Sequence, residues 1–382
     1  MQRVAYHGNG IMFARFRLLI LATLCQLLLA PSALAGAART PHVRPAVLDP
    51  PPTQAQVQQA ITRLQSWYNP QTGLWETTGW WNSANALSGL IDFARTTHNQ
   101  SYDSIIARTY TANIHSGFLD HYYDDEGWWA LTWIDAYDLT GQAKYLRTAQ
   151  IIFANMTTGW DNTCGGGLWW SKKRAYKNAI ANELFLSVAA HLSNLALTGK
   201  ERAQYAAWAQ REWHWFRRSG MIERDHLISD GLTSACRDNH KTHWTYNQGV
   251  ILGGLVALYR HDRRPSDLRE ANRIASAAIR NLSGPYGILH ERCEPECGGD
   301  GSQFKGIFMR NLAALYRYSS RKSYQRFILR NADSILRRDQ SPSHAFGLVW
   351  SGPPGAANAS TQSSALDALV AALQLDTQEH RP

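Results

Sequence analysis

The chain has 382 residues, of which 44% are hydrophobic, and carries a formal net charge of +9 at neutral pH. That hydrophobic fraction is ordinary for a globular core. The Lys and Arg residues are scattered, with the densest groups at 171–174 and 260–265, and no nucleic-acid motif accompanies them. This argues against a nucleic-acid partner and favours a solvated basic surface, with attraction to an acidic glycan or envelope surface as the alternative.

The N-terminus has the pattern of a secretory signal peptide. Arg15 and Arg17 precede an apolar run over 18–30, and the sequence "PSALA" ends at Ala35 with the small-residue cleavage pattern. We expect residues 1–35 to be removed and the protein to be secreted or periplasmic, with no membrane span after cleavage. The Pro- and Ala-rich stretch 36–52 is then a tether, residues 53–376 form a single monomeric domain, and residues 377–382 form a polar tail.

Four cysteines remain after the signal segment. Cys293 and Cys297 close a short "CEPEC" loop, which leaves Cys164 and Cys236 as a long-range pair. An even number of cysteines in an exported chain favours disulfides. The alternative is a four-cysteine zinc site, but this spacing matches zinc ligands poorly, and we expect no metal and no cofactor.

Helical periodicity predominates from residue 53 onward, with little strand-like alternation. Six segments are apolar nearly all round and rich in small residues: 80–94, 126–139, 177–196, 244–260, 304–318 and 361–375. Six amphipathic segments alternate with them: 54–68, 102–114, 143–156, 201–217, 267–281 and 322–338. Because the first set requires burial on every side, we predict an all-α (α/α)6 toroid with six inner and six outer helices.

Asp124 and Asp125 lie side by side in "HYYDDEGWW", just before an inner helix. They could simply cap the helix and favour the positive end of its dipole. Aromatic residues precede several other inner helices, so in a toroid the loops would converge on one aromatic cleft. A carboxylate pair in such a cleft suits glycoside hydrolysis. Both side chains reach one bond only if the dipeptide lies in the loop before the first regular turn.

Three long blocks carry a resemblance to a known family. The segments 122–146, 165–192 and 243–260 resemble the characteristic blocks of glycoside hydrolase family 76, the endo-α-1,6-mannanases, in the right order. The resemblance runs from about residue 53 to residue 375. It implies an (α/α)6 fold and retaining hydrolysis of α-1,6-linked mannan. By carry-over, it makes Asp124 the nucleophile and Asp125 the general acid/base.

Other aromatic and polar residues near the starts of inner helices are candidates for sugar binding. Trp81, Trp129, Trp170 and Tyr246 could be stacking platforms, although core packing is the competing role for each. Asp230, in "ISDGL", could hold sugar hydroxyls or belong to an ordinary turn.

A further group of polar residues shares positions at or near the beginnings of inner helices. These side chains either point into the mouth of the toroid or act in capping and packing. They are Asn85, Lys177, Asn178, Asn182, Gln248 and Lys305.

The preferred hypothesis is a secreted hydrolase that cleaves within α-1,6-mannan. A transglycosylase acting on mannose-containing wall glycans would use the same covalent intermediate. A non-catalytic glycan-binding protein would not need two acids at one bond. In a scaffold protein the two aspartates would be caps only, and Asn would replace either of them without loss of function.

Overall fold

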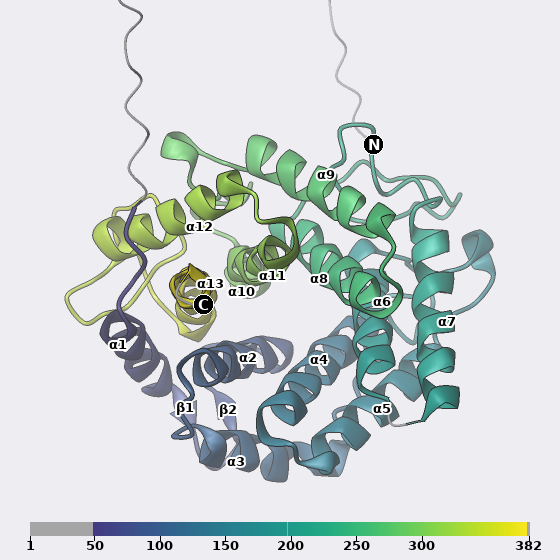
Figure 1. Cartoon of the computed structure of the whole chain (residues 1–382), viewed down its shortest axis with the longest axis horizontal. Helices are drawn as coiled ribbons and strands as arrows, with labels where there is room; N and C mark the ends of the chain where they lie inside the picture. The colour runs from purple at the N-terminus through teal and green to yellow at the C-terminus, as the bar shows by residue number, and fades with distance from the viewer. Residues whose placement is uncertain (1–48, 197, 380–382) are drawn as a thin grey trace, which may run out of the picture. The chain divides into compact units, whose positions relative to one another are not determined.

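Two sets of helices alternate along the chain and form an inner and an outer layer in the computed structural model (Figure 1). The structure describes residues 49–196 and 198–379. The predicted signal peptide and residues 36–48 of the predicted tether lie outside the described residues.

The inner layer surrounds the centre of the ring in Figure 1. Its helices are α2 (Trp80–Thr97), α4 (Tyr123–Thr140), α6 (Ala179–Leu195), α8 (Thr245–Asp262), α11 (Phe304–Ser319) and α13 (Ala359–Glu379). The outer helices are α1 (Gln54–Gln65), α3 (Asp103–Asn113), α5 (Ala143–Thr157), α7 (Gly199–Phe216), α9 (Pro265–Asn281) and α12 (Lys322–Ser334). Helix α13 contacts both α1 and α2, which closes the ring. The predicted (α/α)6 toroid is therefore confirmed within the described residues.

Short elements connect these helices. They are the hairpin of β1 (Tyr68–Asn69) and β2 (Leu74–Trp75), the turns η1 (Ile114–Ser116), η2 (Thr163–Gly165) and η3 (Pro285–Gly287), the short helix α10 (Gly298–Gly301), and η4 (Ile335–Asp339), which continues α12. β1 and β2 pair antiparallel. Helix α13 continues through Glu379, beyond residue 377, where we expected the polar tail to begin.

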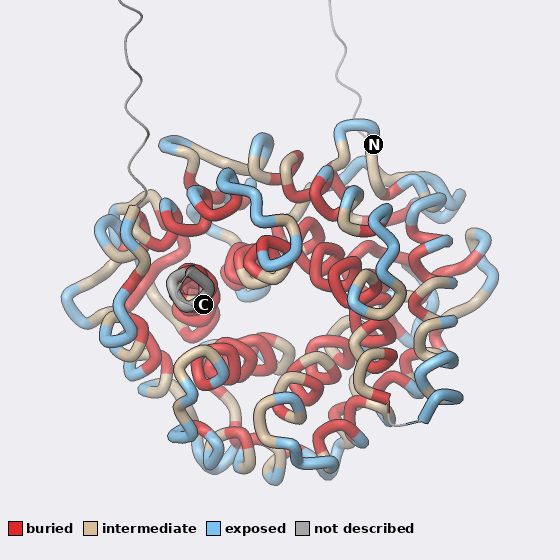
Figure 2. Tube along the Cα trace, viewed as in Figure 1, coloured by how far each residue is buried: buried red, intermediate tan, exposed pale blue. Residues whose placement is uncertain are grey.

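The composition of the inner helices follows from their packing. Figure 2 shows the inner layer almost wholly buried, whereas the outer helices each expose one face. Small residues allow the inner helices to approach closely: a Cβ added to Gly306 would lie 2.4 Å from the carbonyl oxygen of Ser364, and one added to Gly249 would lie 2.6 Å from Cα of Phe308. Glycine is therefore required where α11 meets α13 and where α8 meets α11.

A repeated hydrogen-bond pattern joins the inner helices to the loops that precede them. In three of these helices, the fourth residue is Asn or Gln, and its side-chain oxygen accepts a hydrogen bond from a loop backbone N–H. The pairs are Leu168 with Asn182, Ile228 with Gln248, and Phe346 with Gln362. Each side chain thereby satisfies a buried backbone N–H that has no partner in a β-sheet. This pattern fixes the loops at one end of the ring.

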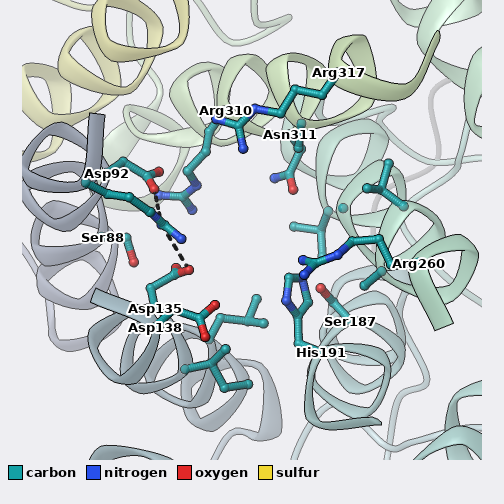
Figure 3. A pocket seen from close by; sticks show the side chains of 18 of the residues that line it. Ser88, Asp92, Asp135, Asp138, Ser187, His191, Arg260, Arg310, Asn311 and Arg317 are labelled. Atoms are coloured by element: carbon teal, nitrogen blue, oxygen red, sulfur yellow. Dashed lines mark hydrogen bonds and ion pairs between the residues drawn. The ribbon is translucent and has the colours of Figure 1, made fainter. Parts of the chain in front are cut away.

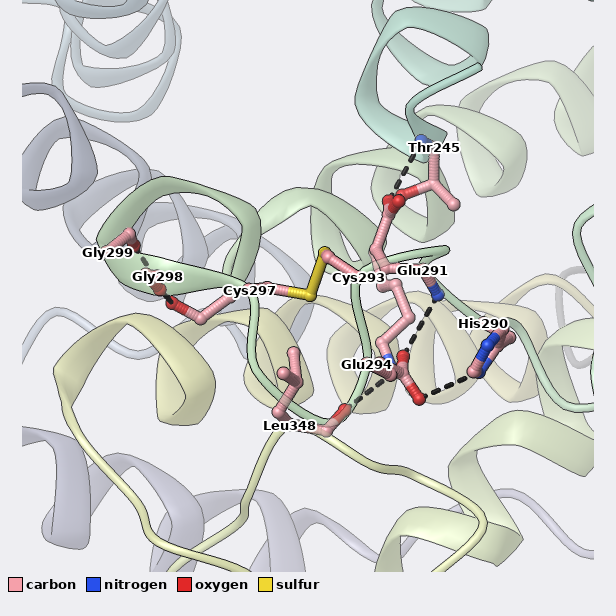
Figure 4. Close-up of a disulfide and its surroundings, with 11 residues drawn as sticks. Thr245, His290, Glu291, Cys293, Glu294, Cys297, Gly298, Gly299 and Leu348 are labelled. Carbon is pink, nitrogen blue, oxygen red and sulfur yellow. Dashed lines mark hydrogen bonds and ion pairs between the residues drawn. A yellow bond between two sulfur atoms is a disulfide. The ribbon is translucent and has the colours of Figure 1, made fainter. Parts of the chain in front are cut away.

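Two disulfides link loop segments, and both match the predicted pairs. Cys164–Cys236 joins the loop before α6 to the loop before α8. Cys293–Cys297 closes the short loop before α10 (Figure 4). In the part of the chain that the structure describes, no helix has the length and apolar character needed to cross a bilayer.

Candidate active site

A cleft of about 620 Å³ opens at the end of the ring where the inner helices begin. Its lining comes from the first turns of α2, α4, α8 and α11 and from the loops before α6, α8 and α11. The lining residues are Trp81, Asp124, Trp128, Trp170, Tyr176, Asn178, Asp230, Tyr246, Asp300 and Phe304. Six of these ten were predicted from the sequence as site residues.

Asp124 and Asp125 lie in the first turn of α4, which begins at Tyr123. The pair therefore lies in the first turn and not in the preceding loop, which was our condition for both carboxyl groups to reach one bond. That condition was too strict, because the charge of Asp124 acts on Asp125 and the two carboxyl groups are therefore neighbours in the first turn. Asp124 lines the cleft, and its Oδ2 accepts a hydrogen bond of 3.0 Å from Nε1 of Trp170. Asp125 follows at a different angle around the helix and is partly exposed, beside the cleft lining.

Both carboxyl groups hold their protons more tightly than ordinary aspartates. Burial raises the pKa of Asp124 to about 7, and the hydrogen bond from Trp170 opposes this rise. Burial, followed by the charge of Asp124, raises the pKa of Asp125 to about 9. The charges of Asp120 and Asp300 add to the rise at Asp125. Both carboxyl groups are therefore protonated more readily than ordinary aspartates, and Asp125 holds its proton more tightly than Asp124.

Glu126, the third acidic residue in the row, points away from the cleft. Its carboxylate accepts hydrogen bonds from Nδ2 of Asn155 at 2.7 and 2.8 Å and from the backbone N–H of Asp120 at 3.1 Å. The ammonium of Lys172 lies 3.1 Å from it. Because Glu126 is the fourth residue of α4, it fixes the preceding loop as the amides do in other inner helices. Only the aspartates remain available to the cleft.

A row of aromatic rings forms the floor of the cleft. The ring of Trp128 lies 5.6 Å from that of Trp81 and 6.5 Å from that of Tyr246, with interplanar angles of 22° and 24°. Tyr246 stacks on Phe304 at 3.7 Å. Nearly parallel rings beside a carboxylate can pack against the apolar faces of sugar rings.

Asp300 brings a third carboxylate to the cleft. It lies in α10, is exposed, and its Oδ1 accepts a hydrogen bond of 3.0 Å from Nε1 of Trp81. The disulfide between Cys293 and Cys297 closes the loop immediately before α10 (Figure 4).

Buried carboxylates on the same loop tie it to the barrel. Glu291 accepts a hydrogen bond of 2.9 Å from the backbone N–H of Thr245, at the start of α8. Glu294 forms a 2.5 Å ion pair with Lys305, whose ammonium also donates to the carbonyl of Leu348. These contacts hold the loop that carries Asp300 over the starts of the inner helices.

Asp230 and Asn178 both lie in the cleft, as predicted. The hydroxyl of Tyr176 donates a 2.5 Å hydrogen bond to Oδ2 of Asp230, and Nδ2 of Asn239 donates to that hydroxyl. Asn178 is the N-cap of α6, where its side chain accepts from the backbone N–H of Ala181. Asn178 therefore has the capping role as well as a place in the cleft wall.

Several residues predicted to bind substrate are buried and lie outside the cleft lining. Trp129 is 0% exposed and packs against Trp80, Phe118 and Trp133. Asn182 and Gln248 bind loop backbone as described above. None of the three is part of the cleft lining, and the structure gives each a packing or loop-binding role.

The two predicted lysines are also buried. The ammonium of Lys177 donates to the carbonyls of Thr163, Gly166 and Gly167 at 2.7–2.8 Å and forms a 2.9 Å ion pair with Asp161. Lys305 is 1% exposed and binds loop groups in the same way. Both lysines donate to loop carbonyls and pair with carboxylates, and neither is part of the cleft lining.

Asn85 belongs to a different cavity, within the ring, and is not part of the cleft lining. Its Oδ1 accepts a hydrogen bond of 2.7 Å from Arg310. Figure 3 shows this cavity, with Asp92 and Asp135 in its lining. Arg95 forms ion pairs with both of these carboxylates. The ring of Trp128 contributes to both cavities. The sugar-binding prediction for Asn85 therefore does not agree with its position.

Four cleft residues were missed by the sequence analysis: Trp128, Tyr176, Asp300 and Phe304. Trp128 could have been found, because it lies four residues after Asp124 and so shares its helix face. Asp300 gave no such signal, since it reaches the cleft only through the packing of the loop before α11.

Comparisons with known proteins agree with this architecture. Residues 53–381 match the family described as glycosyl hydrolase family 76. Mannan endo-1,6-alpha-mannosidase DCW1 of Candida albicans is 28% identical over 264 residues, covering 61% of this chain and 57% of the relative. The protein of the same name from Saccharomyces cerevisiae is 27% identical over 334 residues, covering 78% of this chain and 72% of its own length. The chain thus spans little more than half the length of the Candida relative.

Solved structures share the fold over nearly their whole length. The Lin0763 protein of Listeria innocua superposes with a TM-score of 0.77 at 25% identity, covering 86% of this chain and 99% of its own. An α-1,6-mannanase of Salegentibacter, inactivated by replacing two adjacent aspartates and bound to α-1,6-mannotetrose, gives a TM-score of 0.75 at 22% identity. It covers 84% of this chain and 99% of its own. The chain belongs to glycosyl hydrolase family 76.

Proposed function

We propose that this protein is an endo-acting glycoside hydrolase that cleaves α-1,6-mannosidic linkages with retention of configuration. The observation that carries the proposal is the adjacent pair Asp124 and Asp125 at an aromatic cleft, in which Asp125 holds its proton more tightly than Asp124. The relatives named as mannan endo-1,6-alpha-mannosidases and the mannanase bound to mannotetrose support the choice of linkage.

The two carboxyl groups have different roles in the reaction, according to their protonation states. Asp124, the more acidic partner, attacks the anomeric carbon as a carboxylate, while Asp125 gives its proton to the departing glycosidic oxygen. A covalent glycosyl–Asp124 ester results. Asp125, now ionised, takes a proton from water, whose oxygen attacks the same carbon and releases the sugar. The raised pKa of Asp125 suits the first step, because a general acid must keep its proton near the working pH.

The cleft supplies the binding surface for this reaction. The rings of Trp81, Trp128 and Tyr246 form its floor, and Trp170, Asp230 and Asp300 offer polar groups at its walls. We propose that sugar rings stack on the floor while these polar groups bind hydroxyls. No cofactor is needed for this mechanism.

The test measures reducing ends released from linear α-1,6-mannan by the wild type, Asp124→Asn and Asp125→Asn. We expect each substitution to lower the rate by about 10³-fold or more. Asp138→Asn, at the other end of the same helix, is the matched control and should retain wild-type activity. A folded, active Asp124→Asn protein would overturn the assignment, and so would a wild type that binds the polymer without cutting it.

The stereochemistry and the acceptor can be followed in the same reactions. Nuclear magnetic resonance of the first product should show the α-anomer, because two displacements restore the configuration. Transglycosylation would use the same ester with a sugar acceptor replacing water. Longer products formed in the presence of added mannooligosaccharide would favour this alternative over hydrolysis.

We also propose that the protein is exported through residues 1–35 and that 53–376 is its catalytic domain. Two disulfides support this, because they form and persist in oxidising compartments. N-terminal sequencing of the exported protein should give Gly36 as its first residue. Recovery of the activity only from the cytoplasm would contradict the proposal.

A further inference from the structure

The segment 221–243 connects α7 to α8 and carries Asp230 into the cleft. It folds back on itself through two antiparallel bridges, Ile222 with Ile228 and Leu232 with Asp238. This folding brings Glu223, near the start of the segment, next to residues near its end. The resulting cluster lies outside the cleft lining.

Three side chains of this segment place atoms that can bind a metal close together. Nδ1 of His240 lies 2.9 Å from Oε1 of Glu223 and 3.1 Å from Oδ2 of Asp238. One ligand atom from each residue lies within 4.8 Å of the other two. Donors around a tetrahedral zinc ion, bonded at about 2.0–2.2 Å, lie about 3.3 Å apart, so small adjustments suffice for coordination.

A single N–H of His240 faces the two carboxylate oxygens. An imidazole nitrogen carries one hydrogen at most, and here two carboxylate oxygens compete for it. The carboxylates of Glu223 and Asp238 also bring two negative charges to one histidine nitrogen. A divalent cation would neutralise both charges and would accept all three donors.

Neighbouring groups hold the two carboxylates in place. Oδ1 of Asp238 accepts hydrogen bonds from the hydroxyl of Ser229 and, at 2.9 Å, from the backbone N–H of His240. Nε2 of His243 lies 3.2 Å from Oε2 of Glu223. These contacts use the outer oxygen of each carboxylate and leave Oδ2 and Oε1 directed at His240. Partners of this kind orient ligands in established metal sites.

We propose that Glu223, Asp238 and His240 bind one divalent transition-metal ion of the zinc class, with a solvent molecule completing the coordination. One imidazole and two carboxylates suit zinc, whereas calcium and magnesium prefer oxygen ligands alone. The ion would join the two ends of the segment that carries Asp230. Asn239, between two of the ligands, donates to Tyr176, so the ion would also brace the Tyr176–Asp230 contact.

The test titrates chelator-treated full-length protein with Zn²⁺ by calorimetry, and with Co²⁺ by visible absorption. We expect one equivalent to bind the wild type, and the affinity to fall at least 10-fold in His240→Ala and in Glu223→Gln. His243→Ala should cost about 10-fold by releasing Glu223. The matched control is His226→Ala, a histidine of the same segment that pairs instead with Glu270.

The experiment distinguishes loss of metal binding from loss of folding and from loss of hydrolytic activity. The side chain of His240 is 77% exposed, so His240→Ala should melt at the wild-type temperature in chelator and lose only the zinc-dependent rise. Equal zinc affinity in the wild type and His240→Ala would overturn the proposal. Tighter binding of Ca²⁺ than Zn²⁺, or no binding at about 100 µM Zn²⁺, would also overturn it. Because the readout is metal binding, mannan hydrolysis can fail without affecting this result.

Discussion

Nε1 of Trp170 donates a hydrogen bond of 3.0 Å to Oδ2 of Asp124, which joins the loop before α6 to the first turn of α4. A hydrogen bond to a carboxylate favours its ionised form. Trp170 thus lowers a pKa that burial raises, and keeps Asp124 available as an anion near neutral pH.

Trp170→Phe should therefore shift the acidic limb of the pH–rate profile upward. Loss of this hydrogen bond raises the pKa of Asp124 further, and we expect the limb to move by about one pH unit. The measurement is kcat/KM against pH on α-1,6-mannan. Trp169→Phe is the control, because Nε1 of Trp169 donates to Asp161 at 2.8 Å instead. An unchanged acidic limb in Trp170→Phe would contradict this role.

Asp300→Asn should move the profile the opposite way. The charge of Asp300 raises the pKa of both Asp124 and Asp125, so its removal lowers both values. We expect both limbs of the bell-shaped profile to fall by about 0.5 pH unit, since the interaction is exposed to solvent. A change in rate with no movement of either limb would show that Asp300 acts only in binding.

Asp125→Asn should stabilise the folded protein as the pH rises. Folding raises the pKa of Asp125 from its ordinary 3.8 to about 9. The stability associated with the protonated form is present below pH 3.8 and is lost progressively as the pH rises towards 9. Asparagine avoids this loss. We expect Tm to match the wild type near pH 4 and to exceed it increasingly up to pH 9, with Asp225→Asn as an exposed control.

The long-range disulfide should contribute more stability than the short one. Cys164 and Cys236 are separated by 72 residues, for which chain entropy gives about 4 kcal/mol. Cys293 and Cys297 are separated by 4 residues, which gives about 2 kcal/mol. Urea unfolding of the two double serine variants measures both values. A larger loss for the short pair would show that loop strain or packing outweighs chain entropy.

Lys177→Met should destabilise the fold. The substitution leaves loop carbonyls at 163–167 and the carboxylate of Asp161 without their shared cation, at a cost of about 3 kcal/mol. Urea unfolding checks the value, with the exposed Lys173→Met as the matched control. Wild-type stability accompanied by a raised KM would contradict this structural role and favour the sugar-binding role predicted from the sequence.

The helical framework was predictable because the distribution of apolar residues within each segment indicates how far that helix is buried. Gly249 and Gly306 belong to segments that are apolar on all sides, and such segments must be surrounded by other helices. The disulfide partners were predictable because four cysteines offer few pairings. The aspartate pair was identified by its resemblance to a family, which three long blocks carried.

The roles of the polar residues at the helix starts were not predictable from position alone. Asn182 and Gln248 occupy the fourth position of their helices, and an amide there can face either a cleft or a loop. Their burial against Leu168 and Ile228 depends on loops that fold back from the preceding outer helices. Asp300 likewise reaches the cleft through a loop held by Glu294 and its partners.

The sequence by itself determined the alternation of buried and amphipathic helices, and with it the ring, because periodicity and residue size act over a few neighbouring positions. Only the tertiary structure decided which polar groups face the cleft. Asp124 accepts a hydrogen bond from Trp170 across 46 residues of chain, whereas Glu126, two positions later, accepts hydrogen bonds from Asn155. Hydrogen bonds between distant segments depend on how the helices pack. They decide which side chains are engaged in the structure and which remain available for chemistry.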